Sequence, residues 1–204
     1  MILFLDVISP IPEFFVIEDN KVVIRTNIIS NKSDKLSDNI FQTYFKLNND
    51  LKLTEKLKKI AITIGPGSYT SLRVGASFIS ALKISRQLPF CAISIEDILN
   101  FKLEKNKNEN LGFFIVSSNN QQFFCSLNKN KKIEYLKIDE EKEYLFNQID
   151  ALYYNFRELK TNDKNLKQYK FFIIEEFLNN FSKLIFTKKG IIKPIYISNN
   201  KILN

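Results

Sequence analysis

The sequence contains no histidine, and it has only two cysteines, five glycines and five prolines among 204 residues. Without histidine the chain cannot build a Ser-His-Asp or Cys-His nucleophile, an HExxH zinc site or a histidine acid–base catalyst. Cys91 and Cys125 lie inside apolar runs and lack CxxC spacing, so we expect reduced thiols in the core. Reduced thiols are typical of a cytoplasmic protein.

Long apolar runs are also absent. No run reaches the roughly 18 residues of a membrane-spanning helix, so we expect no membrane association. The apolar N-terminus lacks the basic region of a signal peptide and is better explained as a first strand, residues 2–8. The net charge is +8, but the lysines are scattered and only four residues are arginine. We therefore expect no more than weak, salt-dependent attraction to RNA phosphates.

Three of the five glycines fall between residues 60 and 75. The apolar, β-branched run 60–64 predicts a buried strand, and a helix should follow as far as about Leu88, where Pro89 ends it. Between them we expect a tight turn, in which Gly67 takes a positive φ and Ser68 or Thr70 caps the helix. The predicted structural turn consists of Gly65, Pro66, Gly67 and Ser68.

A glycine turn before a helix can also bind an anion through its backbone N–H groups. This turn, however, lacks the lysine of a Walker A loop, and Thr70 stands where GxGxxG requires its third glycine. Asp6, at the end of the first strand, could hold a metal-bound nucleotide. We favour a turn-capping role for it, because Pro10 and Pro12 in the following loop cannot donate N–H groups. We therefore predict no catalytic residue, no metal site and no cofactor.

Two helices carry apolar stripes that we expect to form an interface. The first, residues 33–51 with Ser33 or Asp34 as its cap, has one stripe of apolar residues at three- and four-residue intervals. The helix after the glycine turn, residues 69–88, has apolar surface on two sides and small residues that permit close helix approach. We expect Val74, Phe78 and Leu82 to face the sheet and the opposite side to bind a partner. Arg73 either pairs with an acidic group outside its helix or lies solvated on Tyr69. The predicted interface consists of Leu36, Ile40, Tyr44, Leu47, Leu72, Arg73, Gly75, Ala76, Ile79 and Lys83.

The rest of the chain is predicted to divide into two lobes. A charged, asparagine-rich connector at residues 102–110 places residues 1–106 in the first lobe and residues 107–204 in a smaller second one. Asp19-Asn20 predicts a hairpin turn, and Ser94 and Asp97 predict a capping box. Past the connector we expect a three-stranded meander up to residue 138, helices at 140–148 and 175–186, and an extended tail at 193–197.

The glycine segment Gly65-Pro-Gly-Ser-Tyr-Thr-Ser-Leu-Arg-Val-Gly75 closely resembles the GPGSFTGLRIG signature of the TsaB (YeaZ) family. Residues 1–6, 88–99 and 193–197 are similar to that family's opening strand, its IPLVGVSSLEAL segment and its terminal PxYL. The likeness is strongest over residues 60–99 and weak over 100–190. It implies an α/β fold of the actin-like ATPase (ASKHA, ribonuclease H-like) type, with a reduced C-terminal lobe.

The same resemblance implies a non-catalytic subunit that pairs with TsaD, through helices, in making N6-threonylcarbamoyladenosine at position 37 of ANN-decoding tRNAs. It further implies TsaE in a larger complex and tRNA contact only through the complex. Because the predicted interface would be a large apolar patch in the monomer, we expect a homodimer through the same face when the chain is alone. Two alternatives stay open. One is an independent actin-like ATPase or glycoprotease-like peptidase, and the other is a basic tRNA-binding subunit, for which no basic stripe is visible.

Overall fold

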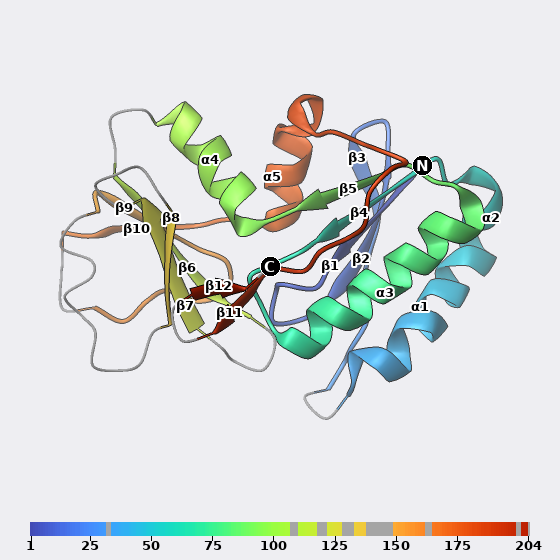
Figure 1. The fold of residues 1–204 in the computed structure, drawn as a ribbon, viewed down its shortest axis with the longest axis horizontal. Coiled ribbons are helices and arrows are strands. Elements are labelled where there is room, and N and C mark those ends of the chain that lie inside the picture. The colour runs from blue at the N-terminus through green and yellow to red at the C-terminus, as the bar shows by residue number, and fades with distance from the viewer. Residues whose placement is uncertain are drawn as a thin grey trace.

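Two five-stranded sheets lie side by side in the computed structural model, with helices packed around the first of them (Figure 1). The described residues are 1–31, 34–106, 110–117, 122–127, 133–137, 149–161, 165–198 and 201–203. Within them, no helix combines the length and the apolar character needed to cross a membrane. The expected α/β fold with two lobes is confirmed.

The first lobe has a sheet ordered β3-β2-β1-β4-β5, in which β1, β4 and β5 are parallel and β1, β2 and β3 form antiparallel pairs. Its parallel strands are connected through helices, as parallel strands require. Its elements are β1 (Ile2–Asp6), β2 (Glu13–Glu18), β3 (Lys21–Asn27), α1 (Leu36–Leu51), α2 (Leu53–Lys56), β4 (Lys59–Thr63), α3 (Tyr69–Arg86), β5 (Phe90–Ile93) and α4 (Ile95–Lys105).

The second sheet is ordered β10-β9-β6-β7-β8. Antiparallel pairing of β6 with β7 and of β7 with β8 confirms the predicted meander. The helix predicted at residues 140–148 lies outside the described residues. The strands are β6 (Leu111–Val116), β7 (Gln122–Leu127), β8 (Ile133–Lys137), β9 (Ala151–Tyr154) and β10 (Lys167–Lys170).

Beyond β10 the chain returns to the first lobe. Helix α5 (Ile173–Asn179) packs there through Phe177, whose ring centroid lies 4.6 Å from that of Phe4 on β1. The helix predicted at 175–186 is thus shorter, and a 3-10 turn, Phe181–Lys183, follows it. Residues 107–204 were predicted to form the second lobe, and the apolar side chains of α5 belong to the same hydrophobic cluster as those of the first sheet.

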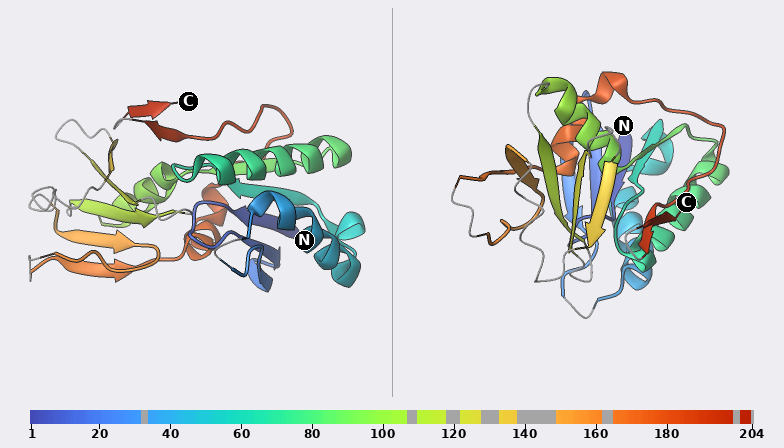
Figure 2. Two further views of the ribbon diagram at one scale, coloured as in Figure 1. Left: turned by 90° about the horizontal axis from the view of Figure 1, so that it is seen from below. Right: turned by 60° about the vertical axis from the view of Figure 1, so that its left-hand side comes forward.

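A tail segment then crosses the edge of the first sheet and continues along α3 (Figure 2). Thr187 and Phe90 exchange two backbone hydrogen bonds of 2.9 Å, and Lys83 Nζ donates to the carbonyl of Gly190. Lys83 was predicted at a partner interface, but it binds this segment instead. The tail ends in a small hairpin, β11 (Tyr196–Ser198) and β12 (Lys201–Leu203).

Two local features predicted from the sequence, a hairpin turn and a capping box, are present in the structure. Asp19 and Asn20 both have positive φ, 48° and 59°, which is the geometry of a tight hairpin turn between β2 and β3. At the start of α4, Asp97 N donates to Ser94 Oγ (3.1 Å) and Ser94 N donates to Asp97 Oδ2 (2.7 Å). The predicted capping box is therefore present.

The two helical faces predicted to bind a partner are instead buried in the monomer. On α3, Gly75 faces the sheet, since a Cβ there would lie 2.8 Å from Val7 Cγ1 at the end of β1. Leu72 and Ile79 share this face and are 1% and 0% exposed. Ala76 is buried as well, and so are all four interface residues predicted on α1: Leu36, Ile40, Tyr44 and Leu47. The prediction was wrong because it assigned the sheet-facing side of each helix to the partner.

The tight glycine turn predicted between β4 and α3 is confirmed, but the positive φ belongs to Gly65 and not to Gly67. Gly65 has a φ of +115° and joins Pro66 through a cis peptide bond, whereas Gly67 has no positive φ. A Cβ on Gly65 would collide with the carbonyl oxygen of Ile195 in the tail. Gly65 is therefore required both by its backbone conformation and by the close approach of the tail.

Replacing Gly65 by Ala should lower the free energy of unfolding by about 3 kcal/mol or more, because the new methyl group meets backbone as well as an unfavourable φ. The control is Gly190→Ala, at a φ of +91° with nothing within 4 Å of the added Cβ. That change should cost only about 1–2 kcal/mol. Urea unfolding followed by circular dichroism measures both. Equal losses would contradict the close contact between Gly65 and the tail.

Replacing Ile79 by Glu should destabilise the protein by at least about 4 kcal/mol, since the carboxylate would enter a site of 0% exposure. Ile84→Glu is the control on the same helix, because Ile84 is 76% exposed. It should change the free energy of unfolding by about 0.5 kcal/mol or less. A folded Ile79→Glu variant with normal stability would show that α3 is rotated relative to the structure.

Candidate functional site

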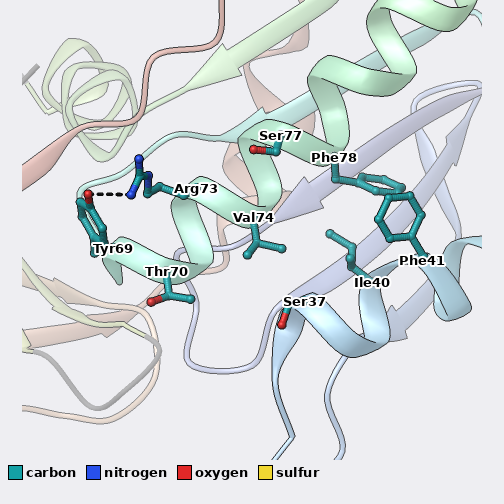
Figure 3. Close-up of a pocket in the computed structure, with 9 residues that line it drawn as sticks. All are labelled: Ser37, Ile40, Phe41, Tyr69, Thr70, Arg73, Val74, Ser77 and Phe78. Atoms are coloured by element: carbon teal, nitrogen blue, oxygen red, sulfur yellow. Dashed lines mark hydrogen bonds between the residues drawn. The ribbon is translucent and has the colours of Figure 1, made fainter.

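A groove of about 460 Å³ runs between α1 and α3 on the outer side of the helical layer (Figure 3). Thr70 and Val74 of α3 point toward α1, and Ser37 and Ile40 of α1 lie opposite them. The residues that line it, which we call the α1–α3 groove, are Ser37, Ile40, Phe41, Tyr69, Thr70, Arg73, Val74, Ser77 and Phe78.

The lining of this groove is apolar with a small polar edge. Ile40, Phe41, Val74 and Phe78 supply aliphatic and aromatic surface, while the polar groups are four hydroxyls and the guanidinium of Arg73. None of the described residues in the lining carries a carboxylate. Such a surface is suited to an apolar side chain and to a small number of hydrogen bonds, as in protein interfaces.

Aromatic packing fixes the end of the groove that is farther from Arg73. Phe41 on α1 meets Phe78 on α3 edge-on, with ring centroids 5.2 Å apart. Phe78 is itself buried and lies 5.4 Å from Tyr44 and 5.6 Å from Phe14 on β2. Phe41 therefore packs on one side against fixed aromatic rings. Its other side faces solvent, and the residue is 53% exposed.

Two phenylalanines of α1 remain uncovered. Besides Phe41, Phe45 is 59% exposed and touches the ring of Tyr44, with centroids 6.3 Å apart. They are four residues apart and so share one face of the helix, one position beyond the buried stripe of Ile40 and Tyr44. The prediction missed them, although α1 has more apolar residues than its buried stripe needs. That excess is the signal in the sequence that could have identified them.

Of the residues predicted at an interface, Arg73 is exposed and lines the groove. Its Nη1 donates a 2.9 Å hydrogen bond to the hydroxyl of Tyr69, and its Cζ lies 4.9 Å from the centre of that ring. Tyr69 in turn contacts Tyr196 of the tail, with ring centroids 4.8 Å apart. The local part of the prediction, an arginine packed on Tyr69, is thus confirmed.

A second cavity, of about 240 Å³, lies where residues of both sheets meet beside the end of β1. Asp6, Glu13 and Arg25 line it from the first sheet, and Asn155 and Lys170 line it from the second. Arg25 holds both carboxylate oxygens of the buried Glu13, at 2.7 and 3.0 Å. Arg25 and Glu13 therefore neutralise each other's charge in the wall of the cavity.

The Asp6 carboxylate is occupied by its own turn. Asp6 Oδ1 accepts hydrogen bonds from Ile8 N (2.9 Å), Ser9 N (3.3 Å) and Thr63 Oγ1 (3.1 Å), and Oδ2 accepts one from Ser9 Oγ (2.6 Å). Burial raises the pKa of Asp6 above its usual value, and these hydrogen bonds oppose the shift. This geometry is that of the turn-capping role preferred from the sequence.

Acidic and thiol groups do not converge on a metal site in the described part of the chain. No three histidine, cysteine, aspartate or glutamate side chains lie close enough there to hold an ion. Cys91 and Cys125 are both buried free thiols, and burial raises the pKa of Cys91 to about 12. Both thiols are therefore protonated and unreactive at neutral pH.

Comparison with solved structures identifies the fold. The structure "YeaZ from Pseudomonas aeruginosa" superposes with a TM-score of 0.57 at 12% sequence identity, covering 96% of this chain and 99% of the other. A second, described as an uncharacterized protein with similarity to peptidase YEAZ from Pseudomonas aeruginosa, gives 0.58 at 12% identity, with 97% and 99% covered. At this identity the likeness establishes the fold alone, and it agrees with the actin-like arrangement predicted above.

A search among curated proteins found no match. A family model does match, over residues 23–187, and its description is "TsaD: tRNA N6-adenosine threonylcarbamoyltransferase". The matched region includes the glycine corner, both helices of the groove and all five strands of the second sheet. The expected likeness to TsaB (YeaZ) proteins is thereby confirmed, and the chain belongs to the TsaD family of tRNA threonylcarbamoyladenosine biosynthesis, with the fold of YeaZ.

Proposed function

We propose that this chain is a non-catalytic subunit that binds a separate TsaD transferase and supports N6-threonylcarbamoylation of adenosine 37 in ANN-decoding tRNAs. The observation that carries the proposal is the α1–α3 groove with Phe41 and Phe45 exposed beside it. Large apolar side chains gathered on one exposed face mark interaction sites. The chain's membership of the TsaD family indicates the kind of partner.

The state of the Asp6 loop supports a non-catalytic role. In that loop the one carboxylate at the end of β1 accepts four hydrogen bonds from the protein itself. Pro10 and Pro12 follow in the same loop and have no N–H groups for a phosphate. A nucleotide phosphate at this position would thus compete with the internal bonds of the turn.

We propose that the chain, when alone, forms a homodimer through the same groove. A two-fold dimer pairs the same surface patch of both subunits, so each copy would cover the exposed apolar face of the other. Binding of TsaD would then exchange one copy of this chain for the transferase. In this proposal TsaE joins the larger complex, and tRNA is bound only by the complex.

Replacing Phe41 by Asp should weaken binding of the TsaD transferase from the same cell by about thirtyfold or more, because an aromatic anchor is lost and a charge enters an apolar groove. Phe41 is 53% exposed, so the fold should persist, as circular dichroism can check. Affinity is measured by calorimetry, and threonylcarbamoyl transfer to tRNA by the reconstituted pair should fall with it.

The control is Ile185→Asp, which introduces the same charge at a side chain that is 80% exposed and outside the groove. Its affinity should stay within about twofold of wild type, as is usual for a substitution outside an interface. Equal affinity of the Phe41 and Ile185 variants would overturn the assignment of the groove. Absence of any complex with wild-type protein would overturn the proposed function itself.

The second cavity provides a test of the alternative, an independent actin-like ATPase. Titration of the isolated chain with ATP and Mg²⁺ should show no tight binding, because the Asp6 oxygens are already engaged by Ile8, Ser9 and Thr63. Tight binding that Asp6→Asn abolishes would instead support the ATPase. Asn keeps one oxygen for these donors, so the variant removes the charge without emptying the turn.

A further inference from the structure

Three side chains at the start of α3 hold one another in place at the rim of the α1–α3 groove. Arg73 stacks over the ring of Tyr69 and donates to its hydroxyl, and the ring of Tyr69 also contacts that of Tyr196 from the tail. We call Tyr69, Arg73 and Tyr196 the rim cluster. Figure 3 shows Tyr69 and Arg73 together on the side of α3 away from α1.

The charge of Arg73 is not balanced by the described part of the protein. The three ion pairs found there involve other residues, and the first turn of α3 contains no acidic side chain. Arg73 lies directly after that first turn, near the helix end where the macrodipole disfavours a cation. A fixed guanidinium in this position is stabilised most by an anion that comes from outside the chain.

The surroundings of Arg73 distinguish between a carboxylate and a nucleic-acid phosphate. Among the described residues that line the groove, Arg73 is the one with a charge, and its neighbours there are apolar or hydroxyl side chains. A phosphate backbone is bound by several cations along its path, and Lys83 further along α3 is engaged by Gly190. One cation at the end of an apolar groove is complementary to an apolar segment that carries a carboxylate.

We propose that the rim cluster is a carboxylate receptor, and that the protein docked in the groove places an Asp or Glu side chain on Arg73 while its apolar side chains contact Phe41 and Phe78. This inference rests on the proposed function, in which that protein is the TsaD transferase. One N–H of Arg73 is used by Tyr69, and the planar guanidinium has further donors for a bidentate carboxylate.

Tyr196 acts in this receptor as a positioning residue. It does not contact the groove, since it is not part of its lining, but its ring limits the movement of Tyr69. A fixed Tyr69 keeps the guanidinium in one orientation, so less conformational entropy is lost when the carboxylate binds. The tail that carries Tyr196 is anchored independently by the Ile195 N to Ile64 O hydrogen bond of 2.7 Å.

The experiment measures the affinity of the full chain for the TsaD transferase by calorimetry at low and high NaCl concentration. Arg73→Gln should bind about tenfold more weakly or worse at low salt, because a charge-assisted bidentate contact is lost. Its affinity should also depend less on salt than that of wild type. Arg73→Lys should be intermediate, because it keeps the charge but loses the planar fork.

Lys46→Gln is the control, since it removes one positive charge from an exposed position of α1 outside the groove. It should bind within about twofold of wild type. For the positioning role, Tyr196→Phe should bind normally and Tyr196→Ala should lose about threefold, with circular dichroism confirming the fold. The Phe variant keeps the ring that packs on Tyr69, so the pair separates loss of the contact from loss of the hydroxyl.

Equal affinities of wild type and Arg73→Gln would overturn this inference and leave the proposed function standing. A loss of tRNA binding by Arg73→Gln with unchanged transferase binding would overturn it in favour of a phosphate. Weakened self-association with unchanged transferase binding would overturn it in favour of a second copy of this chain. If wild-type protein binds no transferase at all, both the proposed function and this inference fail.

Discussion

The arrangement of the first lobe depends on one crossing of three chain segments at Gly65. Ile64 accepts a hydrogen bond from Ile195 N (2.7 Å), and the carbonyl of Gly65 accepts one from Ile95 N (2.9 Å). There is no room at this point for a Cβ on residue 65. The crossing sets where β4 ends, where α3 begins and where the tail passes, and it therefore determines the position of the α1–α3 groove and of its rim.

Much of the framework could be predicted from the sequence because it depends on local signals. The Asp19-Asn20 turn, the Ser94 capping box and the glycine corner follow from the backbone preferences of the residues themselves. The positive φ was assigned to Gly67, although Gly65 has it. The two glycines flank the same proline, and only the approach of Ile195, 130 positions later in the numbering, distinguishes them.

The groove lies between the two helices that carry the predicted interface residues, but most of those residues lie on the sheet-facing sides of the helices. Periodicity shows that a helix has an apolar stripe, but it does not show which partner covers it. In α3, apolar residues occur on two sides, and the close contact of Gly75 with Val7 decides which side faces the sheet. Phe41 and Phe45 became visible as site residues only once burial separated them from Ile40 and Tyr44. The turn-capping role of Asp6, by contrast, could be predicted from its neighbours in the chain. Most of the donors that bind its carboxylate lie within three residues of it.

The return of the tail to the first sheet has a consequence for biosynthesis. A ribosome releases β1, α1 and α3 long before residues 187–196, so the groove can be assembled while its rim still lacks Tyr196 and β5 still lacks its Thr187 neighbour. Contacts of such long sequence separation form late in folding. The groove between α1 and α3 can therefore form first, and its rim is completed only when residues 187–196 have been translated and have packed against β5 and Tyr69.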